Sequence, residues 1–230
     1  MSGRDQVPML RDDPLVTIAV PTFNRAPLLK ECVAAALAQT YEQIEVLVSD
    51  NASTDETRQV MTEFADNRLR TVCQQTNNGM LPNWNACLAE ARGDYIIFVP
   101  DDDRPAPWLV RKCVELVRRQ PDIPIVITLS DLYAASFGTV GAARTSGSIA
   151  TGIVEGTEIL SEFLMDRITV TMCGIMMRVD MLRTSGGIPG YYGHTADLAA
   201  WVPMLFLGKA GFVNEACATF RFHSDSQTCR

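Results

Sequence analysis

The chain has 230 residues, of which 47% are hydrophobic, and its 27 acidic and 20 basic residues give a formal net charge of −7. This composition is typical of a folded domain and argues against a disordered chain. The acidic balance, without a basic stripe, argues against nucleic acid as a partner.

The sequence contains no recognisable membrane-spanning segment or signal peptide, and its cysteines show no pairing pattern. No apolar run approaches the roughly 20 residues that span a bilayer, and the first residues lack the apolar core of a signal peptide. Seven cysteines are scattered without a CxxC pair, which favours buried thiols in a reducing compartment over disulfides or zinc ligands. We therefore expect a cytoplasmic protein with no transmembrane segment.

Apolar runs and helical patterns alternate over the first 130 residues, after a leader at 1–14 that we expect to be flexible. Strands are predicted at 16–20, 44–48, 69–73, 95–99 and 125–129. Helices are predicted at 27–38, after the capping-box spacing of Ser53 and Glu56, at 82–91 following a turn at 77–79, and after Pro105 and Pro107. This alternation predicts an α/β fold with a mainly parallel central sheet covered by helices on both faces.

The pattern changes after residue 130. Residues 134–152 are rich in Gly, Ala, Ser and Thr without periodicity, which predicts a flexible loop, either an active-site flap or a surface excursion. A helix at 157–165, a strand at 170–178, a turn at 186–187, a helix over 198–206 and a strand pair near 212 and 219–222 follow. Residues 15–230 therefore read as a single domain.

Three polar clusters come directly after predicted strands, at 21–25, 49–51 and 101–103. Ligands of open α/β sheets bind beyond the carboxyl ends of the strands, where these clusters would converge. Consecutive carboxylates such as Asp101, Asp102 and Asp103 repel one another unless a cation is present. Oxygen ligands favour Mg²⁺ or Mn²⁺, so the triplet predicts a divalent metal site. The alternative is a solvated acidic turn before a helix.

Two segments together carry a specific resemblance: VTIAVPTFNRAPLL…QTYEQIEVLVSDNASTDET and NNGMLPNWNACLAEARGDYIIFVPDDD. They resemble the family-2 glycosyltransferases of the GT-A fold. The similarity continues through GGIPGYYGHTADLAAW and ATFRFHSDSQT, and so covers nearly the whole chain. It implies an inverting, metal-dependent enzyme that transfers a sugar from a UDP, dTDP or GDP donor to a hydroxyl acceptor, such as a glycan or a lipid-linked saccharide. Polysaccharide or glycoconjugate biosynthesis is the expected setting.

The resemblance also implies a role for each matching residue. Residues 15–130 would form the nucleotide-sugar half and 131–230 the half that supplies the acceptor site and the catalytic base. The expected substrate-binding residues are Pro21, Thr22, Asn24, Arg25, Asp50 (toward the nucleotide base), Asn78, Asp101, Asp102 and Arg221 (toward the phosphates). The expected metal ligands are Asp103 and His223, and the expected catalytic base is Asp197.

Several of these roles have plainer alternatives. Asp197 stands alone where many relatives carry a Glu-Asp pair, and an Asp at a helix N-terminus is also favoured by the helix dipole. His223 could be structural and Arg221 could form a surface ion pair. Trp84 and Trp201 fit core positions, whereas Trp108 follows the triplet closely and could stack on an acceptor sugar.

Two other functional classes compete with a glycosyltransferase. A nucleotidyltransferase would need a Gly-rich basic loop after the first strand, where this chain has PTFNRAP. A non-catalytic nucleotide-sugar-binding subunit would bind a nucleotide without turning over any acceptor. Peripheral contact with the inner face of the membrane also stays open, although no basic amphipathic helix supports it.

Overall fold

The computed structural model describes residues 13–134 and 139–222, so the expected leader lies almost entirely outside the described residues. The strands form one mixed sheet in the order β3-β2-β1-β4-β9-β6-β10-β5, while β7 pairs with β6 and β8 with β10. The strands are β1 (Val16–Thr22), β2 (Ile44–Asp50), β3 (Leu69–Cys73), β4 (Tyr95–Phe98), β5 (Arg104–Pro105), β6 (Ile125–Ala134), β7 (Thr139–Gly141), β8 (Gly152–Glu155), β9 (Ile175–Arg178) and β10 (Lys209–Phe222).

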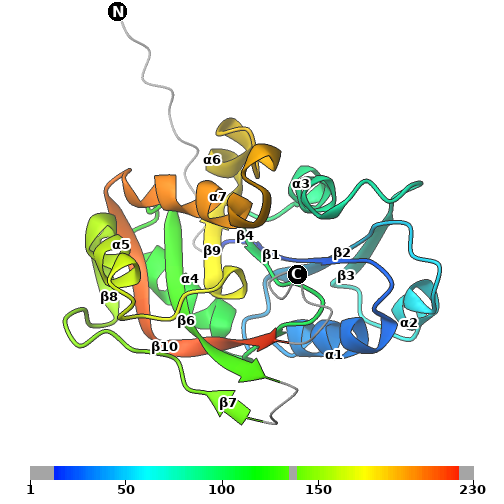
Figure 1. Ribbon diagram of the computed structural model, residues 1–230, viewed down its shortest axis with the longest axis horizontal. Coiled ribbons are helices and arrows are strands. Elements are labelled where there is room, and N and C mark those ends of the chain that lie inside the picture. The colour runs from blue at the N-terminus through cyan, green and yellow to red at the C-terminus, as the bar shows by residue number, and fades with distance from the viewer. Residues whose placement is uncertain (1–12, 135–138, 223–230) are drawn as a thin grey trace, which may run out of the picture.

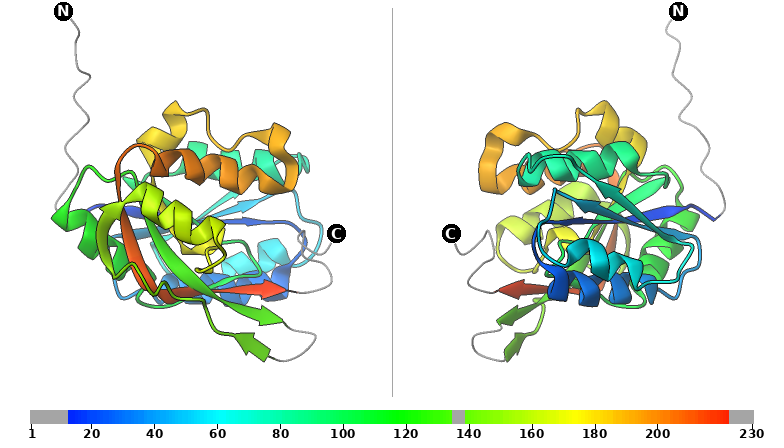
Figure 2. Two further views of the ribbon diagram at one scale, coloured as in Figure 1. Left: turned by 60° about the vertical axis from the view of Figure 1, so that its left-hand side comes forward. Right: turned by 90° about the vertical axis from the view of Figure 1, so that its right-hand side faces the viewer.

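Helices cover both faces of the sheet, which confirms the predicted α/β layering (Figure 1; Figure 2). One face carries α1 (Ala26–Leu37), α2 (Thr57–Thr62) and α4 (Leu109–Arg119). The opposite face carries α3 (Met80–Glu90), α5 (Gly156–Leu164), α6 (Val179–Thr184) and α7 (Ala196–Leu205). The 3₁₀ helices η1 (Met172–Gly174) and η2 (Gly190–Thr195) precede β9 and α7.

Strands β3, β2, β1 and β4 form the parallel block that the alternating pattern predicts. Each is followed by a helix, or in β4 by the acidic triplet, so their carboxyl ends lie at one edge of the sheet. In this register Thr22 of β1 lies opposite Asp50 of β2. The polar clusters therefore start from adjacent strands.

The second half of the sheet departs from the sequence prediction. The strand expected at 170–178 begins only at Ile175, after η1, and it runs antiparallel between β4 and β6. The expected strand pair near the end is one long strand, β10, whose register shifts between Val213 and Ala218. Bulges of this kind interrupt the alternation of side chains, which is why the sequence looked like two strands.

The loop expected at 134–152 is partly ordered by specific contacts. Residue 134 ends β6, and β7 returns beside it. Asn214, in the bulged part of β10, accepts from the Ser146 N–H and donates to the carbonyls of Ser146 and Ile149. The buried Glu162 accepts a further bond from the Ser146 hydroxyl at 2.7 Å.

The segment predicted as a turn at 77–79 is irregular backbone that leads into α3, and Gly79 has φ +90°, which glycine adopts without a steric penalty. The capping box of Ser53 and Glu56 is wrong: α2 begins after Glu56 without a side-chain cap. The Ser53 hydroxyl instead accepts the Asn24 N–H at 2.9 Å, so a long-range contact has replaced the local one.

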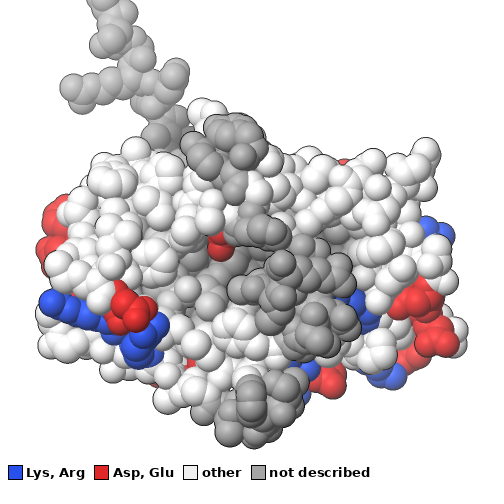
Figure 3. Space-filling view, viewed as in Figure 1, with Lys and Arg blue, Asp and Glu red and all other residues white. Residues whose placement is uncertain are grey.

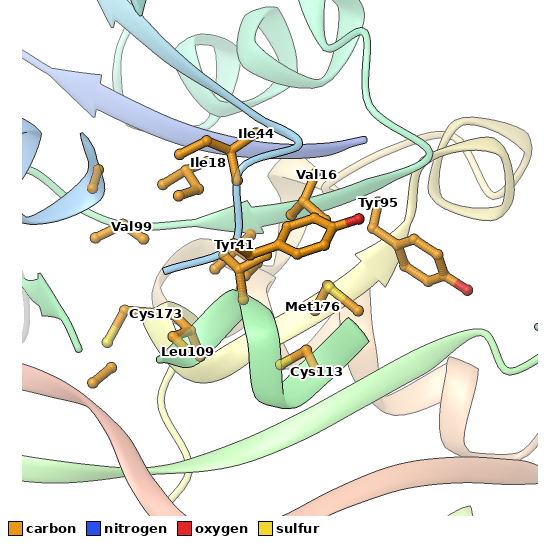
Figure 4. Packing of buried hydrophobic residues seen from close by; sticks show 14 of the residues in the cluster. Val16, Ile18, Tyr41, Ile44, Tyr95, Val99, Leu109, Cys113, Cys173 and Met176 are labelled. Carbon is orange, nitrogen blue, oxygen red and sulfur yellow. The ribbon is translucent and has the colours of Figure 1, made fainter. Parts of the chain in front are cut away.

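Each face of the sheet packs its own apolar cluster. Figure 4 shows part of the α1–α4 side, where Val16, Ile18 and Val99 lie with Leu109 and Cys113 of α4. The core assignments of Trp84 and Trp201 are confirmed: Trp84 stacks on Phe98, and Trp201 meets Phe163 edge-on. Cysteines 32, 87, 113, 173 and 217 are buried free thiols, whereas Cys73 is exposed. No helix in the described ranges is long and apolar enough to cross a bilayer.

Candidate active site

The ends of β1 and β4 meet through the acidic triplet. The Thr22 hydroxyl donates to Asp101 Oδ2 at 2.7 Å. Arg25, just before α1, donates from Nη1 to Asp101 Oδ1 at 3.0 Å and to Asp102 Oδ2 at 2.8 Å. Two clusters that lie 76 residues apart in the sequence are thus joined by a guanidinium placed between two carboxylates.

Asp103 is held differently from its two neighbours. Its carboxylate is almost fully buried, at 1% exposure, and Oδ1 accepts the backbone N–H of Arg221 at 3.0 Å. Oδ2 makes no hydrogen bond to a residue that the structure describes, although the nearby Cys173 thiol acts to lower the pKa of this carboxyl. The Arg221 guanidinium turns away to pair with Glu31 at 2.7 Å. A buried carboxylate oxygen without a donor is energetically costly and needs a cation or a proton.

Burial controls the protonation of this cluster. It raises the pKa of Asp101 to about 6, although Arg25 and the Thr22 hydroxyl act in the opposite direction. Burial, reinforced by the charge of Asp102, raises the pKa of Asp103 well above its ordinary value. The site therefore disfavours negative charge in the absence of a further cation.

The carboxylates of the triplet are of the kind that binds a divalent cation, but they are not arranged as a preformed set of metal ligands. Within residues 13–134 and 139–222, no three His, Cys, Asp or Glu side chains converge as metal ligands. However, Asp103 offers a free carboxylate oxygen beside Asp102, and hard divalent cations prefer such oxygens. The other expected ligand, His223, lies outside the described residues.

The end of β2 forms a second, fully hydrogen-bonded layer. Asp50 is completely buried: Oδ1 accepts the Ser53 N–H, and Oδ2 accepts from Arg58 Nε at 3.2 Å. Asn24 has φ +52° and accepts the Thr54 N–H, which fastens the loop after β1 to the loop after β2. Asp50 is therefore an acceptor whose outer partner, Arg58, has a largely exposed side chain.

Asparagines extend this layer toward α3. Asn51 donates to Asn77 Oδ1 and accepts the Asn78 N–H at 3.1 Å, so Asn78 lies beside the end of β2. Sequence reasoning missed the buried Asn83, which accepts from the Ser49 hydroxyl and donates to the Ser49 carbonyl. Its position inside an apolar helical pattern is a signal of a buried polar role.

Asp197 lies in the first turn of α7, on the face of the sheet that α3 also covers. It is half-buried, and this burial raises the pKa of its carboxyl while the Leu198 N–H partly lowers it. No hydrogen bond or ion pair links it to the acidic triplet within the described part of the chain. The structure therefore raises the pKa of the Asp197 carboxyl and keeps it outside the hydrogen-bond network of the acidic triplet.

The face of the molecule drawn in Figure 3 is hollowed near its middle. An acidic side chain is visible at the hollow, while most charged side chains in this view lie along the left and lower right edges. In this view, the described atoms around the hollow are mostly uncharged, apart from this one acidic side chain.

Comparison with known proteins identifies the family of this chain. The family model "Glycosyl transferase family 2" matches residues 17–141. The chondroitin synthase of Pasteurella multocida is 25% identical over 221 residues, which is 94% of this chain and 22% of that protein. The chain spans 15% to 38% of the length of the first three curated relatives.

Solved structures share the fold. The TarS fragment of S. aureus in complex with UDP has a TM-score of 0.73 at 17% identity, covering 91% of this chain and 61% of that one. The mannosyltransferase PcManGT of Pyrobaculum calidifontis, in complex with GDP-Man and Mn²⁺, has a TM-score of 0.64 at 19% identity, covering 93% and 58%. With its parallel strand ends, its acidic triplet and these matches, the chain belongs to glycosyltransferase family 2 and has the GT-A fold.

Proposed function

We propose that the protein is an inverting, metal-dependent glycosyltransferase that uses a nucleotide-diphosphate sugar and a hydroxyl acceptor. The observation that carries this proposal is the buried Asp103 Oδ2 without a hydrogen-bond donor, next to two carboxylates held by Arg25. A solvated acidic turn would leave these oxygens exposed, whereas Asp103 Oδ2 is buried and makes no hydrogen bond to a described residue.

The donor would bind across the ends of β1, β2 and β4. In this assignment Asp50 and Asn78 lie toward the nucleotide base, and Pro21, Thr22 and Asn24 line the pocket. Asp101 and Asp102 face the ribose and the water shell of the metal. Arg25 exchanges its carboxylate partners for the diphosphate, to which its guanidinium can bind in a bidentate manner. Arg221 would likewise leave Glu31 for a phosphate oxygen.

Asp103 would hold the divalent cation, Mn²⁺ or Mg²⁺, together with His223. The bound cation would offset the charge that develops on the diphosphate leaving group. Asp197 would take the proton from the acceptor hydroxyl, for which a carboxyl with a raised pKa is suited. Residues 15–130 would then form the donor half and 131–230 the acceptor half of one domain.

The similar proteins support the substrate class. The neighbouring structures contain UDP, UDP-GlcNAc, or GDP-Man with Mn²⁺, and a polysaccharide synthase is among the relatives. We infer a nucleotide sugar as donor and a role in polysaccharide or glycoconjugate synthesis. The buried free thiols support a cytoplasmic location, where the protein could act at the inner face of the membrane.

A thermal-shift panel of UDP, GDP, CDP and dTDP, each with and without Mn²⁺, tests this proposal. We expect one nucleotide to raise the melting temperature only when Mn²⁺ is present, because a ligand bound to the folded state stabilises it. The exposed Asp122→Asn should behave like the wild type, and Asp103→Asn should lose the shift. Equal stabilisation of wild type and Asp103→Asn would refute the metal assignment.

A further inference from the structure

A separate hollow lies between α1 and the paired strands β5 and β10. It has a volume of about 790 Å³, within the range of about 300–1,000 Å³ that is usual for small-molecule sites. The end of β10 runs beside α1 in the views of Figures 1 and 2. Small residues such as Ala34, Ala35 and Ala218 are among those that line the hollow.

Trp108 forms one wall of this hollow. This residue is 38% exposed, whereas Trp84 and Trp201 in the core are 8% and 2% exposed. An indole that is held at the start of a helix and open to solvent presents a flat apolar surface to a ligand. The C–H face of a sugar ring is a matching surface, since it is apolar while its hydroxyls point sideways.

A polar row crosses the hollow beside this aromatic wall. Thr219 of β10 pairs with Asp131 of β6 on one side and with Arg104 of β5 on the other. Adjacent strands are about 4.8 Å apart, so the backbones of Asp131 and Arg104, on either side of Thr219, are about 10 Å apart. The row offers an acceptor, a hydroxyl and a multiple donor, the groups that pair with neighbouring sugar hydroxyls.

The charges around the hollow balance. Lys30 and Arg104 oppose Glu31 and Asp131, so two positive and two negative side chains line it. A balanced site gives no net attraction to a polyanion or a polycation. Together with the aromatic wall, this balance favours a neutral, polyhydroxylated ligand.

We propose that this hollow is a glycan-binding groove that holds a neutral part of the acceptor, away from the hydroxyl that reacts. Trp108 stacks on a sugar ring, and Asp131, Thr219 and Arg104 bind its hydroxyls. The inference rests on the proposed function, because that function makes a saccharide the acceptor. Arg104, which lines the groove, directly follows Asp103 in the sequence.

The test measures binding of three neutral hexasaccharides, cellohexaose, maltohexaose and N-acetylchitohexaose, by calorimetry and tryptophan fluorescence. We expect at least one to bind and to shift the emission of the exposed tryptophan. Trp108→Ala should weaken binding about tenfold, since the lost stacking contact is worth about 1 kcal/mol or more. Arg104→Ala should weaken it about fivefold or more. Trp108→Phe should retain most of the affinity, and the remote, exposed Phe206→Ala should retain all of it.

The outcomes separate this inference from the proposed function. The groove assignment would be overturned if Trp108→Ala and Arg104→Ala bound the saccharides as tightly as the wild type. It would also be overturned if an oligogalacturonate hexamer bound more tightly than every neutral probe, or if no probe bound at all. The manganese-dependent nucleotide shift should be the same in wild type and Trp108→Ala. Saccharide binding that depends on Trp108, without any nucleotide shift in the wild type, would refute the proposed function and leave the groove in place.

Discussion

In the reaction that we propose, the acidic triplet would act on the donor and Asp197 on the acceptor, and the protein holds these two groups in different ways. The triplet is buried and receives hydrogen bonds from Thr22, Arg25 and the backbone of Arg221, although Asp103 Oδ2 accepts none from a described residue. Asp197 is half-buried at the start of α7, with only nearby backbone N–H groups lowering its pKa. One site is fixed by long-range contacts and the other by a single helical turn.

This difference indicates how each site is built to work. Leaving-group stabilisation requires charges that are already positioned when charge develops, which suits a buried network. A base must reach a hydroxyl that arrives with the acceptor, which suits a carboxyl with fewer fixed partners. Substitutions can therefore separate the two sites.

The sharpest separation comes from Asp103→Asn. We expect metal-dependent donor hydrolysis and transfer to fall to background, because the cation supplies several kcal/mol to the transition state. The same variant should melt higher than the wild type without ligands at neutral pH, since it removes a buried negative charge. Activity assays and melting curves measure the two effects. A variant that is active, or less stable, would contradict this account of Asp103.

Asp197→Asn should affect only the acceptor end. We expect transfer to fall about 10³-fold, within the usual range for loss of a general base. The nucleotide-dependent thermal shift should stay at the wild-type value, because the donor site is untouched. Turnover close to wild type with a true acceptor would show that another group takes the proton.

Arg25→Ala tests whether the triplet depends on its guanidinium. We expect a loss of about 1–3 kcal/mol in the free energy of unfolding, which is less than for a fully buried pair because the Arg25 side chain is 24% exposed. Chemical denaturation measures this loss. Combining Arg25→Ala with Asp102→Asn should restore part of it, while Arg144→Ala at an exposed ion pair should change stability by less than about 1 kcal/mol.

The smallest effect expected is a pH dependence of the triplet. The pKa of Asp101 is raised to about 6 by burial, so folding takes up a proton between this value and the ordinary one near 3.8. Lowering the pH from about 6 toward 4 should therefore stabilise the unliganded wild type relative to Asp101→Asn. Protons compete with a cation, so the Mn²⁺-dependent shift should also decline over this interval. Parallel melting curves for both proteins at several pH values provide the check.

The parallel block was predictable because its signals are local. The apolar runs at 16–20, 44–48 and 95–99 matched β1, β2 and β4, and the acidic triplet came directly after the last of them. The contacts that give the triplet its character were not predictable, since Arg25 and Asp101 are 76 residues apart. No local pattern indicates which long-range partner a carboxylate will take.

The second half was harder to predict for the same physical reason. The bulges of β10 break the alternation of side chains, and β9 is only four residues long. α6, with six residues, was missed because so short a segment shows little periodicity. Ser53 shows that even a strong local motif fails when a distant N–H competes for its hydroxyl.

The central place of β10 has a consequence for synthesis on the ribosome. This strand fills the sheet between β6 and β5 and also carries β8, although it spans residues 209–222 and its partners come 54 or more residues earlier. Until that segment emerges, β6 presents an unpaired apolar edge to other nascent chains. The parallel block can form beforehand, so the part of the sheet built on β6 and β10 is the region in which a nascent chain would depend on chaperones.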